Sequence, residues 1–148
     1  MTLIIALGNP EHTVLVADRL HSSDEGPVPG EFTKAIVLEL ADARLAVAFT
    51  GLATGALRQQ IRAADAFRTR FWLVETLSNV SGPNPTMEAT VAGLAASASR
   101  DIIHVPVDKP ADRALTIFLA GYLYRSSQPT LALHRVSNLK ARPSGVQA

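Results

Sequence analysis

The hydrophobic pattern changes its period twice along this chain, and this change most strongly limits the folds that the chain can adopt. In the first fifty residues, apolar side chains gather in four short strand-like segments, at residues 3–7, 13–18, 35–40 and 45–49. Two stripes with the three-and-four spacing of a helix face follow, at residues 57–77 and 87–98. Strand-like segments return at residues 115–122 and 130–136. Strands followed by helices and further strands predict an α+β fold with mainly antiparallel pairing.

The connections between these segments have the composition of turns and loops. Residues 8–12 carry Gly, Asn and Pro and predict a tight hairpin, whereas residues 19–33 form a long polar loop of a kind that is often functional. Asn84 and Pro85 suit the start of the second helix. We expect one domain over residues 1–138 and a flexible tail over residues 139–148.

Composition excludes several classes of function. Hydrophobic residues make up 47% of the chain and charged residues 18%, which suits a buried core, and a net charge of +1 gives no basic field for nucleic acid. The chain has no cysteine, and its four histidines are scattered, so we predict neither a metal site nor a cofactor. No apolar run is long enough to span a membrane, and we expect a cytoplasmic protein.

Three polar residues have a spacing that suggests a site. Thr2 precedes the first strand, Asp18 ends the second, and Lys34 begins the third, so that two intervals of 16 residues separate them. In a hairpin followed by a third strand, these residues can converge at one end of a sheet. Removal of Met1 would leave Thr2 with a free α-amine, which is a suitable base near neutral pH.

At these residues the chain resembles the proteasome β subunits and related bacterial peptidases, which are N-terminal nucleophile (Ntn) hydrolases. The resemblance is strongest over the first 53 residues and is carried by residues 2–6, 14–19, 33–34 and 46–53. It implies a nucleophilic hydroxyl on Thr2, supported by Asp18 and Lys34, and an oxyanion-hole amide at Gly51. Lys34 would favour the neutral amine, and Asp18 would hold Lys34 in place. The expected reaction is hydrolysis of a peptide or small amide through an acyl-enzyme.

The resemblance also implies a substrate pocket and an incomplete fold. The family positions that line the specificity pocket correspond to His21, Phe32, Phe49 and Ala53, although both phenylalanines also suit a hydrophobic core. Leu20 stands where the family usually has Arg. The family continues with further helices and strands, so we expect antiparallel sheets packed against two helices in a truncated αββα sandwich. A homo-oligomer or a partner subunit would then cover the open sheet face, and an inactive Ntn-like scaffold remains the alternative to an enzyme.

Overall fold

The structure is a computed structural model, which describes residues 4–17, 22–23, 26–27, 34–55, 67–80 and 83–138. It confirms the predicted α+β class, with antiparallel sheets and two α-helices in the described part of the chain. The predicted tail at residues 139–148 lies outside that part. In chain order the elements are β1 (Ile4–Gly8), β2 (Thr13–Ala17), β3 (Ser22–Ser23), β4 (Gly26–Pro27), β5 (Ala35–Glu39), β6 (Ala43–Gly51), β7 (Thr54–Gly55), β8 (Phe67–Arg68), α1 (Thr69–Val80), α2 (Met87–Asp101), the 3₁₀ turns η1 (Ile102–His104) and η2 (Pro110–Arg113), β9 (Leu115–Leu123) and β10 (Thr130–Ser137).

A four-stranded antiparallel sheet forms the centre of the fold. Its strand order is β10-β9-β6-β5, so the two longest strands, β6 and β9, lie in the middle. Both form hairpins with their sequence neighbours, β5 with β6 and β9 with β10. In chain order, both helices lie between β6 and β9. The two strands are nevertheless neighbours in the sheet and pair over the whole of β6, from Ala43 opposite Leu123 to Gly51 opposite Leu115.

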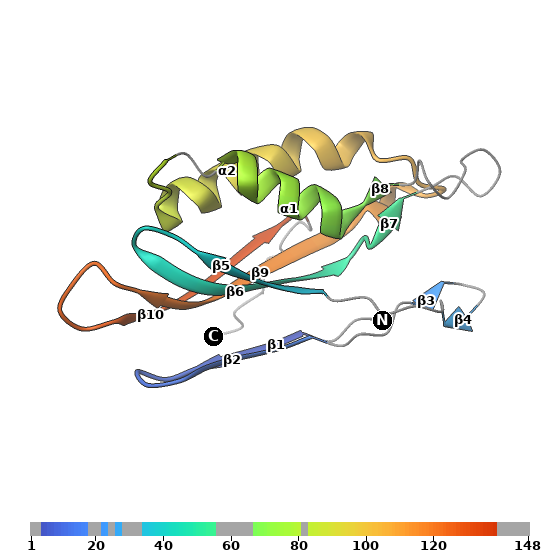
Figure 1. Ribbon diagram of the computed structural model, residues 1–148. Coiled ribbons are helices and arrows are strands. Elements are labelled where there is room, and N and C mark those ends of the chain that lie inside the picture. The colour runs from blue at the N-terminus through green and yellow to red at the C-terminus, as the bar shows by residue number, and fades with distance from the viewer. Residues whose placement is uncertain are drawn as a thin grey trace, which may run out of the picture.

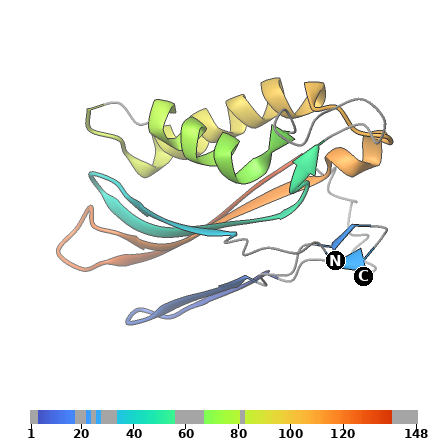
Figure 2. The same cartoon turned by 45° about the vertical axis from the view of Figure 1, so that its right-hand side comes forward.

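The two helices cover one face of this sheet, as Figures 1 and 2 show. Alternate residues of β6 and β9 point toward the helices, because successive side chains of a strand face opposite sides. They meet apolar residues of the helices in one buried cluster. The cluster includes Leu45, Val47 and Phe49 of β6, Ile117 and Leu119 of β9, Leu73 and Leu77 of α1, and Leu94 of α2.

The hairpin β1–β2 lies against the opposite face of the sheet, so the molecule has three layers (Figures 1 and 2). Its strands contact β6 and β9. At the closed end of the hairpin, the hydroxyl of Tyr122 donates to the carbonyl oxygen of Asn9 at 2.8 Å. The side chain of Leu131 on β10 lies close to Gly8. These contacts fix the tip of the hairpin to β9 and β10.

The first helix agrees only in part with the predicted apolar stripe at residues 57–77. Phe67 lies in β8, and α1 begins only at Thr69. Phe71 and Val74, which belong to that stripe, are 60% and 45% exposed, whereas Leu77 of the same stripe is buried. The buried side chains of α1 are instead Thr69, Leu73, Thr76 and Leu77, and residues 57–66 lie outside the described part. The apolar stripe did not predict all the buried positions of α1, because two of the four carry threonine, which a search for hydrophobic residues does not select.

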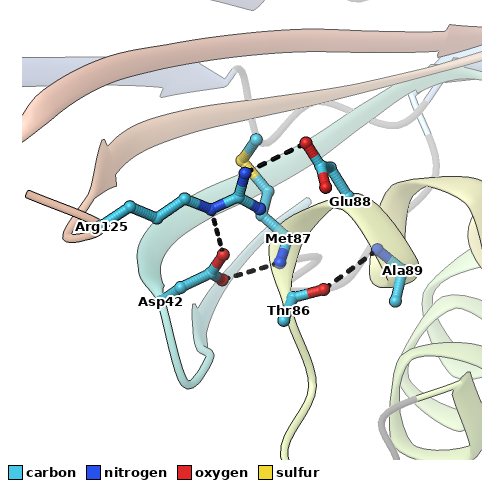
Figure 3. Close-up of polar contacts among 6 residues, drawn as sticks. All are labelled: Asp42, Thr86, Met87, Glu88, Ala89 and Arg125. Carbon is cyan, nitrogen blue, oxygen red and sulfur yellow. Dashed lines mark hydrogen bonds and ion pairs between the residues drawn. The ribbon is translucent and has the colours of Figure 1, made fainter.

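A polar cluster joins the sheet to α2 at one end of the molecule (Figure 3). The Asp42 carboxylate, in the turn between β5 and β6, accepts the backbone N–H of Met87 at 2.8 Å and the Arg125 guanidinium at 2.7 Å. Arg125 also donates to Glu88 at 3.0 Å. Thr86, directly before α2, is the N-cap residue of the same helix, since its hydroxyl accepts the N–H of Ala89 at 3.3 Å. The first turn of α2 is therefore held by the sheet as well as by its own cap.

Candidate active site

The structure describes two of the four residues predicted to be catalytic. Lys34 immediately precedes β5, and Gly51 is the last residue of β6. Thr2 and Asp18 lie outside the described residues. The predicted site is therefore built here from Lys34, Gly51 and the strand ends to which Thr2 and Asp18 connect.

Lys34 is a buried lysine at the edge of the sheet. Only 4% of its surface is exposed, although it stands at the start of an edge strand. Lysine is rarely this buried unless its ammonium group is paired, because an unpaired charge away from water costs several kcal/mol or more. This burial contrasts with the solvated side chain that is usual at the beginning of a strand.

Gly51 has a backbone conformation that excludes other residues. Its φ angle is +95°, and it is the only described residue with a positive φ. A Cβ atom at this position would overlap the carbonyl oxygen of Ala114. Two separate constraints, the left-handed backbone and the close approach of Ala114, therefore require glycine here. The residue as a whole is exposed to solvent.

The turn that follows Gly51 is fixed from two sides. The N–H of Leu52 donates to the carbonyl oxygen of Ala114 at 2.7 Å. On the other side lies the buried Thr69. Its hydroxyl donates to the carbonyl oxygen of Leu52, and the backbone N–H of Thr69 donates to the carbonyl oxygen of Ala53 at 3.0 Å. A backbone amide stabilises the negative charge of a transition state best when the amide does not have to move during the reaction. The bonds to Ala114 and Thr69 give this segment such a fixed backbone.

Four strand ends lie on one side of the molecule. Ile4 and Ala17 are paired, so β1 begins and β2 ends at the same end of their hairpin. Ala35 pairs with Ala48, so β5 begins three residues before β6 reaches Gly51. Figure 1 shows the open end of the hairpin, the start of β5 and the end of β6 together at the right. These are the ends next to which the sequence carries Thr2, Asp18, Lys34 and Gly51.

The predicted substrate pocket is described only in part. Phe49 is buried in the core cluster that faces the helices, and Ala53 is half-buried against the same cluster. His21 and Phe32 lie outside the described residues. In the described residues, Phe49 and Ala53 thus contribute to the core, and their role in substrate binding stays a prediction.

Thr69 and Ala114 were missed by the sequence analysis. Thr69 was hidden within a longer predicted helix, although threonine just before an apolar run is a common signal for a helix start. Ala114 acts through its backbone carbonyl, for which the sequence carries no signal. Both residues position Gly51, and neither carries a reactive side chain.

Two other features are absent from the described residues. These residues contain no group of three or more His, Asp or Glu side chains arranged to hold a metal ion. None of the helices in this part of the chain has the length and apolar character needed to cross a bilayer. In comparisons with known proteins, no family model, no curated protein and no solved structure matches this chain.

Proposed function

We propose that this protein is an N-terminal threonine hydrolase that cleaves a peptide or small amide through an acyl-enzyme on Thr2. One observation carries the proposal: a buried lysine, Lys34, and an exposed glycine in a fixed left-handed conformation, Gly51, stand at strand ends on one side of the molecule. Thr2 is two residues from Ile4, and Asp18 follows Ala17, at the open end of the neighbouring hairpin. The sequence thus carries, next to strand ends of two neighbouring layers, residue types that this chemistry needs.

The proposed reaction assigns one task to each residue. The Thr2 hydroxyl attacks the carbonyl carbon of the substrate while its proton passes to the α-amine of the same residue. The oxyanion that forms accepts a hydrogen bond from the Gly51 N–H, an interaction worth roughly 2.7–4 kcal/mol in comparable sites. The protonated α-amine then gives its proton to the leaving amine. Water hydrolyses the resulting ester and regenerates Thr2.

Lys34 and Asp18 prepare the nucleophile in this scheme. An ammonium near the α-amine disfavours protonation of that amine and so keeps the base neutral. The same charge stabilises the alkoxide character that develops on Thr2. Asp18 would hold Lys34 in its charged form and in one orientation.

Intact-protein mass spectrometry before and after treatment with a β-lactone tests the proposal. We expect a chain that lacks Met1 and gains one acyl group on Thr2. The Thr2→Ala variant should not be acylated, Thr2→Ser should retain labelling, and Lys34→Ala should be labelled at least tenfold more slowly. The matched control is Arg70→Ala, an exposed cation on α1, which should be labelled at the wild-type rate. Retained Met1, or equal labelling of Thr2→Ala, would refute the enzymatic function.

An inactive scaffold is the second candidate, and a specific surface favours it. Ile5, Leu7, Val14 and Val16 on the outer face of hairpin β1–β2 are each at least 40% exposed. They form two aliphatic cross-strand pairs, Ile5 with Val16 and Leu7 with Val14. A contiguous apolar face of this kind marks an interaction surface. If the protein is unreactive toward the lactone but self-associates, and Leu7→Lys abolishes this association, the scaffold function replaces the enzymatic one.

A further inference from the structure

A second surface of the molecule has the features of a binding site. Between the hairpin β1–β2 and the sheet lies an open groove of about 250 Å³, which reaches the edge strand β10. The groove is lined by Ala6 of β1, Phe118 and Leu119 of β9, and Leu133, His134 and Arg135 of β10. It arises because the hairpin contacts mainly β6 and β9, so the underside of β10 beyond Leu131 is less covered.

β10 also offers an edge to which another strand can be added. In the described part of the chain it pairs only with β9, through the eight residues from Thr130 to Ser137. It contains no proline, and its two basic residues are neighbours, so most of the edge lacks the devices that commonly protect such strands. Its outer N–H and C=O groups can therefore pair with an extended peptide.

The side chains of β10 define what such a peptide should carry. Leu133 and Arg135 are two residues apart, so they face the same side of the sheet, where the groove lies. Leu133 is 51% exposed, a large apolar side chain at the groove wall. Arg135 is exposed and has no acidic partner among the described residues. An aliphatic and an acidic residue at the same spacing would complement this pair.

We propose that β10 and its groove bind an extended peptide segment by strand addition, with an aliphatic side chain opposite Leu133 and a carboxylate opposite Arg135. The backbone of the peptide pairs with β10, its aliphatic side chain fills the groove against Phe118, and its carboxylate neutralises Arg135. This site is separate from the proposed active site, because β10 and β5 are opposite edges of the sheet. The inference does not depend on a reactive Thr2.

Fluorescence anisotropy with end-capped, labelled hexapeptides tests the proposal. The probe has valine at position two, glutamate at position four and threonine elsewhere, and a second probe exchanges valine and glutamate, because strand addition can run in either direction. We expect saturable binding of at least one probe with a Kd below about 1 mM. N-methylation of the peptide N–H groups at positions two to five, which removes every donor that could face β10 in either strand direction, should abolish binding.

Charge reversal provides the matched comparison. Arg135→Glu should weaken binding of the glutamate peptide at least fivefold and should bind a peptide with lysine in place of glutamate more tightly than the wild type does. Arg70→Glu, on the helix layer, should leave the affinities for both peptides unchanged. If Arg135→Glu fails to fold, Arg135→Gln should show the loss without the reversal. Hydrogen exchange should slow along residues 130–137 when the peptide binds.

Three results would overturn the proposal. They are the absence of saturable binding to wild-type protein, equal binding by Arg135→Glu and wild type, and amide protection confined to another part of the chain. Sedimentation without peptide tests a different occupant. If the wild type dimerises and Leu133→Asp is monomeric, the edge belongs to a second copy of this chain, which also overturns a peptide site.

Discussion

The carboxylate of Asp42 accepts the backbone N–H of Met87 at 2.8 Å, so a sheet turn caps a helix that begins 45 residues later. A further bond joins the same two regions, from the N–H of Ala41 to the carbonyl oxygen of Pro85 at 2.9 Å, and Arg125 of the β9–β10 connection donates to Glu88 of α2. The β9–β10 connection takes part as well, because the N–H of Tyr124 donates to the carbonyl oxygen of Asp42 at 2.8 Å. One short turn thus links the sheet, its last hairpin and α2.

Asp42→Ala should destabilise the protein by about 1–3 kcal/mol, because it leaves the Met87 N–H without its acceptor and removes one of the two acceptors of the Arg125 guanidinium. Asp42→Asn should cost less, since its amide oxygen can still accept the Met87 N–H. The free energy of unfolding, measured in urea, tests this order. Glu88→Gln is the control, because its exposed ion pair with Arg125 should contribute less than about 1 kcal/mol. Equal stability of wild type and Asp42→Ala would contradict the capping role.

Stability should fall as the pH drops below about 4. Burial by itself raises the pKa of Asp42, but hydrogen bonds from Arg125 and Met87 outweigh it, so the pKa lies below its ordinary value. The pKa of Asp101 is also lowered, first by a hydrogen bond from Arg100 and then by one from the Trp72 indole. The unfolded chain therefore binds more protons than the folded chain as these groups titrate.

The contribution of these two carboxylates is present above the pKa of the unfolded chain and is lost as the pH falls through the folded pKa. Urea unfolding at a series of pH values from 6 to 2 measures it. Asp42→Asn should show a shallower loss of stability below about pH 4 than the wild type. An identical slope in the two proteins would mean that Asp42 has the same pKa in both states.

Gly51→Ala should destabilise the protein by about 1–3 kcal/mol or more, because alanine at φ +95° is strained and its Cβ would overlap the Ala114 carbonyl. Gly8→Ala is the matched control. There a Cβ would meet only the end of the flexible Leu131 side chain, and the φ angle is not positive. Thermal unfolding of both variants decides the matter, and a Gly51→Ala protein as stable as Gly8→Ala would disprove the fixed turn.

Two buried threonines should respond in opposite ways to replacement by valine. Thr90 of α2 is fully buried, and its hydroxyl has no partner among the described residues, so Thr90→Val should be neutral or stabilising. Thr69 is equally buried, but its hydroxyl binds the Leu52 carbonyl oxygen, so Thr69→Val should cost about 1–3 kcal/mol. Urea unfolding of the two variants measures the difference, and an equal loss in both would show that the Thr90 hydroxyl is also satisfied.

The strands of this fold were predictable because their patterns are local. Apolar runs bounded by turn residues mark β5, β6, β9 and β10 in the sequence, and the structure has them with only small differences at their ends. The apolar stripe predicted the buried face of the first helix only in part, because the burial of this helix also depends on a tertiary contact. Thr69 is inside since Leu52 offers it a carbonyl oxygen, and Phe71 is outside with the Arg68 guanidinium 5.6 Å from its ring centroid.

The candidate site was predictable to a smaller extent. Spacing along the chain selected Lys34 and the family resemblance selected Gly51, and the structure adds that one is buried and the other conformationally constrained. The supports of Gly51 were beyond prediction, since they come from Ala114 and Thr69, residues that are distant in sequence and have no distinctive chemistry. The β10 groove was equally hidden, because it depends on how far the hairpin extends beneath the sheet.

Strand β6 separates two regions with different tasks. The turn at Asp42 precedes its first residue, and Gly51 is its last, so nearly the full length of the sheet, roughly 30 Å for nine extended residues, lies between them. Engineering can use this distance. An attachment point for a dye or a solid support near the Asp42 turn would leave the opposite end of the molecule, where the proposed active site lies, free of the attached group.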